Sequence, residues 1–209
     1  MVLAALVSLG LGYLSGSLPW GLWLGRWFCG IDVRTVGSKN LGATNVYRSL
    51  GPGLGIATLL LDVAKGAVPV LLVPRLPVTQ AFPGGREWCM VAVALAAVAG
   101  HVWTCFAGFR GGKGVATMAG VLMALAPVAF AAFAVVFVIT LAITRYVSLG
   151  SILGSVALVI ALGVGGITRP AFAVGVLLAA LVILRHRENL GRLARGTERR
   201  FSFRGGGQA

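Results

Sequence analysis

The apolar stretch from Val115 to Ile143 reads VATMAGVLMALAPVAFAAFAVVFVITLAI, and it decides the topology of the chain. The stretch has roughly thirty residues, whereas a helix needs only about 20 to cross a bilayer. Pro127 interrupts it, and proline breaks helices because it removes a backbone hydrogen bond. The stretch therefore predicts either one tilted helix or two short helices of about 12–16 residues each, joined at Pro127.

The composition around this stretch belongs to a membrane protein. Hydrophobic residues make up 58% of the 209 residues and charged residues only 11%, and the mean hydropathy is +0.94. These values lie outside the range of soluble domains. The first apolar run is longer than the core of a signal peptide, which predicts a retained helix. We therefore expect an all-α integral membrane bundle without a soluble domain.

Polar and turn-rich segments divide the rest of the chain into further spans. The segment at 28–51 is polar, residues 74–86 contain three prolines and two adjacent glycines, and residues 108–114 are rich in glycine. Besides residues 115–143, the spans are expected at 2–26, 53–73, 88–107, 146–166 and 171–184, and the cluster of Gly, Pro and Ser at 15–21 is expected to loosen the first of them.

The positive charges favour two helices over one between residues 115 and 143. With two helices there are seven spans, the N-terminus lies outside, and 14 of the 18 Lys and Arg residues lie in inner segments. With one helix, Arg145 and the arginines from 185 onward move to the opposite side, against the positive-inside tendency. We therefore predict about seven transmembrane helices, with the C-terminus and the active site facing the cytoplasm.

The positive-inside tendency also explains the net charge of +13, so no nucleic-acid partner is expected. The three cysteines, Cys29, Cys89 and Cys105, are scattered and have no histidine at ligand spacing. Neither a disulfide framework nor a metal site is predicted from them.

Residues 37–51 form a polar island, GSKNLGATNVYRSLG, in this apolar chain. Backbone N–H groups at glycines, hydroxyls, amides and cations are the donors that a phosphate needs. A second glycine-rich turn, Gly111 to Gly114, includes Lys113 and leads into a helix, whose N-terminus attracts anions. Alone, this second turn is equally consistent with a tight connection between helices, and it lacks the spacing of a Walker A loop. Together the two segments predict a site for a phosphate ester.

Three ionisable residues lie inside predicted spans, where they are costly to retain and are therefore candidates for function. His101 is one, and its alternative role is a hydrogen bond between helices. Asp62 and Lys65 share a helix face, and their alternative role is an internal ion pair that fixes packing. The stretch from Arg192 to Arg204 is predicted to be a solvated tail that attracts anionic lipid.

These motifs together resemble the bacterial acyl-phosphate:glycerol-3-phosphate acyltransferase family, small multi-span enzymes that begin phospholipid synthesis. The resemblance covers nearly the whole chain, in six blocks that follow one another in order. The blocks are GSLPWG at 16–21, GSKNLGATNVYR at 37–48, DVAKG at 62–66, GH at 100–101 with FRGGKGVAT at 109–117, TRYVSL at 144–149, and RHREN at 185–189.

The resemblance implies transfer of a fatty acyl group from acyl phosphate to the first-carbon hydroxyl of glycerol 3-phosphate, without a cofactor, in the bacterial inner membrane among its lipids. Residues 1–204 are expected to form one acyltransferase domain, with a disordered tail at 205–209. The implied catalytic residues are Ser38, His101 and Asn189; the implied phosphate-binding residues are Thr44, Arg48, Lys113, His186 and one of Ser148 or Ser151; Asn40, Asn45 and Glu188 support them.

Two residues depart from the pattern of this family. Lys39 stands where glycine or another small residue is usual, and Thr104 where proline or serine is common. The His-x4-Asp pair of the acyl-CoA-dependent acyltransferases is absent after His101. The alternative function is a transporter or channel for a small organophosphate, whose path the same cations would line. No convincing internal repeat of the kind found in transporters is present.

Overall fold

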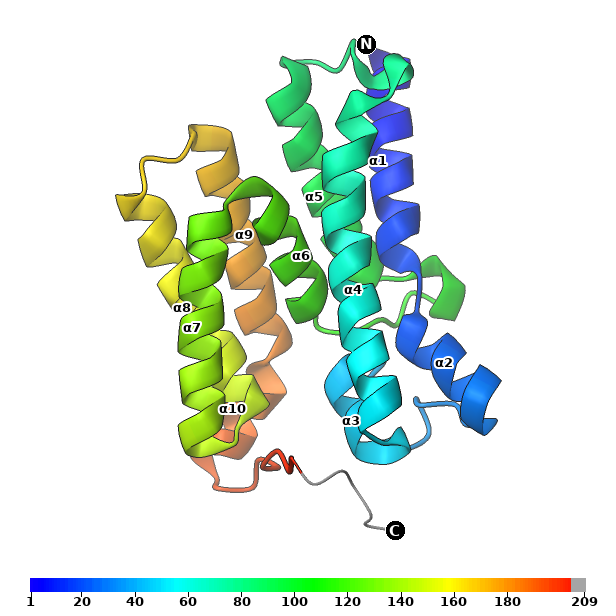
Figure 1. The fold of residues 1–209 in the computed structure, drawn as a ribbon, viewed down its shortest axis with the longest axis vertical. Coiled ribbons are helices and arrows are strands. Elements are labelled where there is room, and N and C mark those ends of the chain that lie inside the picture. The colour runs from blue at the N-terminus through cyan, green and yellow to red at the C-terminus, as the bar shows by residue number, and fades with distance from the viewer. Residues whose placement is uncertain (204–209) are drawn as a thin grey trace. The chain divides into compact units, whose positions relative to one another are not determined.

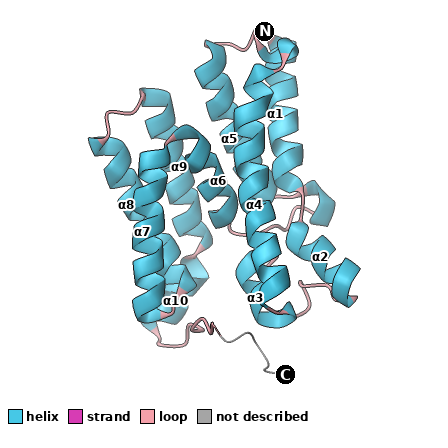
Figure 2. Ribbon diagram, in the orientation of Figure 1, coloured by secondary structure: helices cyan, strands magenta, loops and turns pink. Residues whose placement is uncertain are grey.

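The computed structural model describes residues 1–203, and this part of the chain is built of helices and connecting loops without strands (Figures 1 and 2). The helices are α1 (Val2–Ser17), α2 (Trp20–Cys29), α3 (Ala43–Leu50), α4 (Pro52–Leu72), α5 (Gly85–Val102), α6 (Val115–Leu125), α7 (Pro127–Thr144), α8 (Val147–Val164), α9 (Arg169–Arg185) and α10 (Arg187–Ala194), with short 3-10 turns η1 (Val73–Arg75), η2 (Pro77–Thr79) and η3 (Cys105–Ala107). The all-α prediction is confirmed.

The long apolar stretch does break at Pro127. α6 ends at Leu125 and α7 begins at Pro127, where proline is tolerated because the first turn of a helix has no partner for its N–H group. Within residues 1–203, five helices are long and apolar enough to cross a membrane, or six if the bent pair α9 and α10 counts as one span. The 11 residues of α6 are too few by this measure. The prediction of seven spans and their orientation stays a prediction.

The first span also breaks where the sequence predicted it to loosen. α1 ends at Ser17 and α2 begins at Trp20, and Pro19 lies between them.

The polar island contains a helix that the sequence analysis did not predict. α3 occupies its second half, from Ala43 to Leu50, whereas residues 37–42 form a loop.

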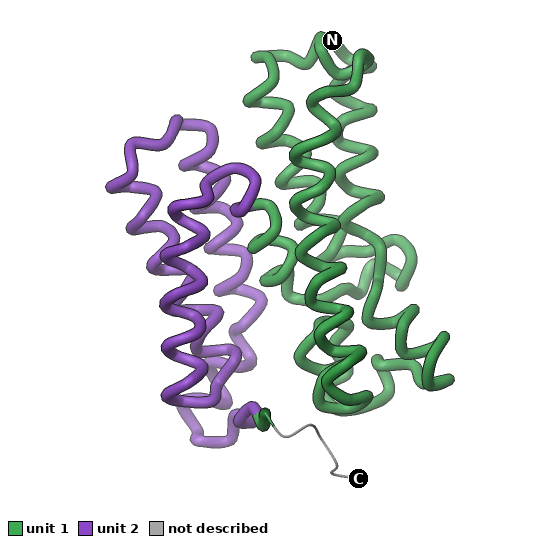
Figure 3. The backbone as a smooth tube through the Cα atoms, viewed as in Figure 1, with its two compact units in different colours: residues 1–121, 202–209 green, residues 122–201 purple. Residues whose placement is uncertain are grey.

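The chain divides into two compact units, coloured separately in Figure 3. Among the described residues, unit 1 contains 1–121 together with Ser202 and Phe203, and unit 2 contains Leu122–Phe201. The prediction of one domain over 1–204 stays a prediction, and the predicted disordered tail at 205–209 lies outside the described residues.

Close approach of helices at glycines holds each unit together. In unit 1, α1 packs on α5, and a Cβ at Gly16 would lie 1.9 Å from the carbonyl oxygen of Ala97. In unit 2, α7 packs on α8, and a Cβ at Gly154 would lie 2.9 Å from the ring of Phe133. Because no hydrophobic force acts between helices in lipid, such close contacts contribute to their association.

Candidate active site

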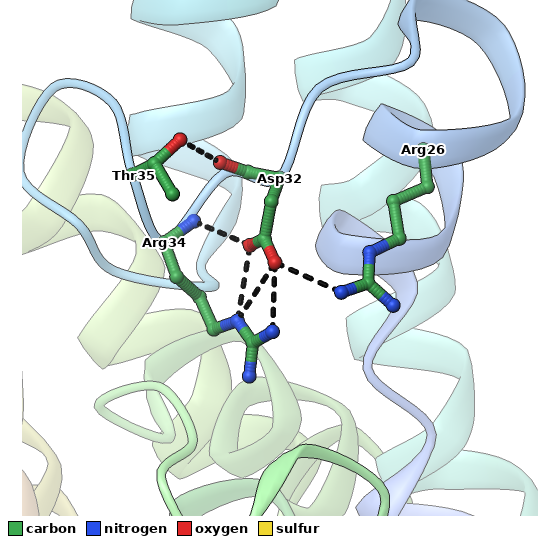
Figure 4. A network of polar contacts seen from close by, with 4 residues as sticks. All are labelled: Arg26, Asp32, Arg34 and Thr35. Carbon is green, nitrogen blue, oxygen red and sulfur yellow. Dashed lines mark hydrogen bonds and ion pairs between the residues drawn. The ribbon is translucent and has the colours of Figure 1, made fainter.

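The loop that leads into the polar island is fixed by the carboxylate of Asp32 (Figure 4). Asp32 accepts hydrogen bonds from the side chain of Arg34 at 2.7 Å and of Arg26 at 2.9 Å, and also from the backbone N–H of Arg34 at 2.9 Å. The Arg34 guanidinium holds the pKa of this carboxyl well below its usual range. Asp32 is therefore ionised at neutral pH and ties the loop to α2.

Asn45, in the first turn of α3, holds the next part of the loop. Its amide nitrogen donates to the carbonyl oxygens of Val33, Val36 and Asn40, and its amide oxygen accepts from the backbone N–H of Ser38 at 2.8 Å. The side chain uses both of its functional atoms on the backbone, and the residue is 3% exposed. Asn45 thus shapes residues 33–40, and its supporting role in the active site stays a prediction.

The turn before α3 has a backbone suited to glycine. Lys39 has a φ of 58°, in the left-handed region, which explains why a residue without a Cβ is favoured at this position. The side chain of Asn40 accepts from the N–H of Gly42 at 2.9 Å. Thr44 lies in the first turn of α3 and Arg48 in its last turn, both partly exposed, and Ser38 is exposed.

Asp62 and Lys65 form the predicted ion pair, with 2.8 Å between Lys65 Nζ and Asp62 Oδ1. Both side chains are less than 5% exposed. Lys65 also donates to the carbonyl oxygen of Leu18 at 2.7 Å, and Thr104 donates to that of Ser17. These carbonyls lie at the C-terminal end of α1, where the helix itself supplies no donors. The buried pair therefore stabilises the break between α1 and α2.

His101 connects this pair to the glycine-rich turn. Its Nδ1 lies 3.0 Å from the hydroxyl of Thr117 on α6 and 3.9 Å from Asp62 Oδ1. The N–H of Gly112 donates to the carbonyl oxygen of His101, and a Cβ at Gly112 would lie 2.2 Å from its Nε2. The contact with Thr117 is a hydrogen bond between helices, the alternative weighed for this residue. The same ring also packs directly against the turn that carries Lys113.

A small cavity, lined by apolar and polar residues, lies beside this cluster. It measures about 10 Å³, and its lining includes Ser17, Asp62, Lys65, His101 and Gly112. The hydroxyl of Ser17 is buried and has no hydrogen-bond partner among residues 1–203. A volume of this size accommodates one water molecule.

Lys113 is separated from α6 by one residue, Gly114, whose φ is +86°. A glycine is needed there because the left-handed conformation is strained for other residues. Lys113 is partly exposed. The positive end of the α6 dipole and this ammonium group lie next to each other in the chain, so they would attract the same anion.

In unit 2, the predicted residues Ser148 and Asn189 meet at a residue that the sequence analysis missed. The carboxylate of Glu198 accepts from Asn189 Nδ2 at 2.6 Å, from the Ser148 hydroxyl at 2.7 Å and from Arg192 Nε at 2.7 Å. Its side chain is 8% exposed. Burial alone would raise the pKa of Glu198, but these hydrogen bonds lower it below its usual value.

The other predicted residues of unit 2 lie close by in the chain but differ in their environment. Ser151 donates its hydroxyl to the carbonyl oxygen of Val147, so its hydrogen is used within α8. His186 is buried, and its Nδ1 lies 2.7 Å from the carbonyl oxygen of Val182. Because a carbonyl oxygen only accepts, Nδ1 of His186 carries the hydrogen of this bond. Glu188 is 78% exposed and lies 4.0 Å from Arg192.

The chain after α10 differs from the solvated tail that the sequence predicted. Arg195, Arg199 and Arg200 are exposed as expected, but Glu198 is partly buried, and the N–H of Phe201 donates to the carbonyl oxygen of Arg145 at 2.6 Å. An isolated acid within a run of arginines was the available signal, because a buried carboxylate needs cationic or hydrogen-bonding partners. The net charge of the stretch does not reveal this acid, because the arginines outnumber it.

Comparison with known proteins shows the family of this chain. The sequence model of the family described as Glycerol-3-phosphate acyltransferase matches residues 6–196. The chain belongs to the glycerol-3-phosphate acyltransferase family. Named relatives include the Glycerol-3-phosphate acyltransferase of Anaeromyxobacter sp., 48% identical over 93% of this chain and 95% of the relative, and that of Geobacter sulfurreducens, 46% identical over 96% and 99%.

Two solved structures of an integral membrane glycerol 3-phosphate acyltransferase are also similar to this chain. The glycerol 3-phosphate form has a TM-score of 0.85 at 37% identity and covers 95% of this chain and 96% of its own. The lysophosphatidic acid form has a TM-score of 0.83 at 36% identity, with 95% coverage of both chains. Membership of this acyltransferase family, with a similar fold, favours an enzyme over the transporter alternative.

Proposed function

We propose that this chain transfers a fatty acyl group from acyl phosphate to the first-carbon hydroxyl of glycerol 3-phosphate, releasing lysophosphatidate and inorganic phosphate. The observation that carries the proposal is the family match over residues 6–196, which includes every residue predicted for the site. The acyl-phosphate donor follows from the motif resemblance. The enzyme then needs no cofactor, because acyl phosphate is itself an activated anhydride.

The reaction joins the glycerol oxygen to the acyl carbonyl carbon and breaks the bond from that carbon to the phosphate oxygen. Both substrates are anions, so cations are needed to reduce their repulsion and to orient them. Arg48 and Lys113 serve this purpose, with Thr44, His186 and one of Ser148 or Ser151 as further phosphate contacts. Ser148 and Ser151 already donate their hydroxyl hydrogens within the protein, so whichever binds phosphate must first rotate its hydroxyl.

Ser38, Asn189 and His101 act on the reacting atoms in this proposal. Ser38 and Asn189 position the attacking hydroxyl or the carbonyl oxygen, and His101 orients or deprotonates. The bond of 3.0 Å between His101 Nδ1 and Thr117 supports the orienting role. In that case the leaving phosphate dianion takes the proton of the hydroxyl.

The membrane arrangement is part of the same proposal. Seven spans, an outer N-terminus and a cytoplasmic C-terminus account for the positive charges in the inner segments, and the helix break at Pro127 supports the count. Residues 1–204 then act as one acyltransferase domain in the bacterial inner membrane, among its lipids.

A test uses the purified full chain with palmitoyl phosphate and glycerol 3-phosphate, and follows phosphate release. We expect release that depends on the acceptor. Lys113→Ala should raise KM, whereas Asn189→Ala should lower kcat. Arg86→Ala, which removes an exposed arginine at the start of α5, is the control and should change neither by more than about twofold. Folded protein without acceptor-dependent release would rule out the proposed reaction.

A further inference from the structure

The chain after α10 returns to α8 by a short series of specific contacts. Gly196, with a φ of +69°, turns the chain after the helix. Beyond the turn, Arg200 lies over the ring of Tyr146 at 5.6 Å, and the N–H of Phe201 bonds to the backbone of Arg145. Glu198 lies between the turn and these contacts. The turn before Glu198 and the contacts after it therefore fix the position of this residue.

Glu198 accepts hydrogen bonds from three directions. One oxygen, Oε1, accepts from Asn189 on α10 and from Ser148 on α8, and the other, Oε2, accepts from the guanidinium of Arg192. With an exposed fraction of 8%, the carboxylate depends on these partners rather than on water. An ionised carboxylate has no hydrogen to donate. All three partners must therefore be donors.

This requirement fixes which way round the amide of Asn189 lies. The nitrogen, as the donor, faces Glu198 at 2.6 Å. The oxygen of the amide is then on the other side, where it is an acceptor. An alcohol that is about to attack a carbonyl carbon needs an acceptor for its hydrogen, so this orientation suits the role proposed for Asn189.

We propose that Glu198 is a positioning residue, which holds the Asn189 amide with its oxygen towards the attacking hydroxyl of the substrate. This inference rests on the proposed function, since it takes Asn189 to be a catalytic residue. Glu198 lies two positions beyond the last residue matched by the family model. It acts through Asn189 and touches no reacting atom itself.

The contrary possibility is that Glu198 competes with the substrate. Its carboxylate would then occupy donors that the phosphate of glycerol 3-phosphate needs. The two possibilities differ in kinetics. Loss of a positioning group lowers kcat, whereas loss of a competitor lowers KM and leaves kcat unchanged.

Glu198→Gln separates orientation from mere structural support. The guanidinium of Arg192 needs an acceptor, so the oxygen of the introduced amide should turn to it. The introduced nitrogen then faces Asn189, which must present its own oxygen and rotate its amide by half a turn. The Ser148 hydroxyl, which donates to the same carboxylate oxygen in the wild type, must also turn and accept from this nitrogen. Each contact is then kept, but the substrate meets a donor. We expect kcat to fall about tenfold to a hundredfold, with KM for glycerol 3-phosphate within about threefold and the melting temperature nearly unchanged.

The double variant Asn189→Asp with Glu198→Gln tests the same point in reverse. A carboxylate in place of the Asn189 amide has an oxygen on both sides, so it accepts from the introduced amide and still accepts from the substrate hydroxyl. We expect kcat to recover at least about threefold relative to Glu198→Gln alone. Glu87→Gln is the control, because Glu87 is an exposed glutamate in the first turn of α5 with no role in the proposed site, and it should leave kcat unchanged.

The outcomes distinguish this inference from the proposed function. Wild-type kcat in Glu198→Gln, together with an inactive Asn189→Ala, would overturn the positioning role and leave the proposed function standing. A lower KM at unchanged kcat would identify a competitor and overturn it as well. Wild-type turnover in Asn189→Ala would instead remove Asn189 from the proposed active site.

Discussion

The ammonium group of Lys65 donates a hydrogen bond of 2.7 Å to the carbonyl oxygen of Leu18, the residue before Pro19. A lysine on α4 thus satisfies a backbone group that the end of α1 leaves without a helical partner. The same ammonium group neutralises Asp62 at 2.8 Å. The pair that the sequence left open between structure and function therefore has a clear structural task.

Replacing Lys65 by methionine should destabilise the protein severely. The change leaves the Asp62 carboxylate buried without its cation, and it removes the donor to Leu18. Breaking a buried pair by removing one partner costs about 3–5 kcal/mol. Thermal unfolding in detergent measures the effect. Adding Asp62→Asn should recover part of the loss, and Lys39→Met at an exposed position should cost little. A double variant no more stable than Lys65→Met would contradict this account.

Gly112→Ala should abolish most of the activity. A Cβ there would meet the imidazole of His101 at 2.2 Å, so either the ring or the turn that carries Lys113 must move. A displacement of about 1 Å in such a turn is sufficient for a loss near a hundredfold. Phosphate release measures it. Gly53→Ala is the control, since nothing lies within 4 Å of the added Cβ, and equal activity of the two variants would refute the argument.

Asn45→Asp should unfold the loop at 33–40, although the two residues have the same shape. The new carboxylate would replace the amide nitrogen that faces the carbonyl oxygens of Val33, Val36 and Asn40. A buried acceptor that faces other acceptors should lower the free energy of unfolding by about 3 kcal/mol or more. Asn40→Asp is the matched control, because its oxygen accepts from Gly42 and a carboxylate accepts equally well. The melting temperatures of the two variants should therefore differ clearly.

The stabilisation from Asp32 should disappear in acid. Its folded pKa is lowered, chiefly by Arg34, from the usual value of 3.8. A group with a lowered pKa stabilises the fold at pH values above its unfolded pKa, and this contribution is lost as the pH falls towards the folded pKa. Asp32→Asn should therefore melt below the wild type at pH 6, and the difference should shrink below about pH 4. A difference that stays constant between pH 6 and pH 3 would contradict the prediction.

Local rules predicted much of this fold. Pro127 and Pro19 break helices because each lacks an N–H group, and both breaks lie where the sequence indicated them. Asp62 and Lys65 are three residues apart, so helix geometry alone brought them together. α3 was missed because residues 43–50 are polar on average, although Ala43, Val46, Tyr47 and Leu50 recur at helical spacing and α3 packs on α4.

The site was less predictable where partners are distant in sequence. Ser148 and Glu198 are 50 positions apart, and no periodicity relates a residue on α8 to one after α10. The contact of His101 with Thr117 could be anticipated only as one of two alternatives, because the sequence does not say which helix faces the ring. The net positive charge of the segment after α10 also concealed Glu198, because arginines outnumber it there.

The place of Glu198 in the chain also matters for anyone who trims this protein. A gene cut at the boundary of the family match would end at residue 196, and it would still encode Ser38, Lys113, Asn189 and the other residues predicted for the site. Its product would lack the one carboxylate that orients the Asn189 amide. Such a shortened enzyme would contain every sequence motif of the predicted site and still have a low kcat.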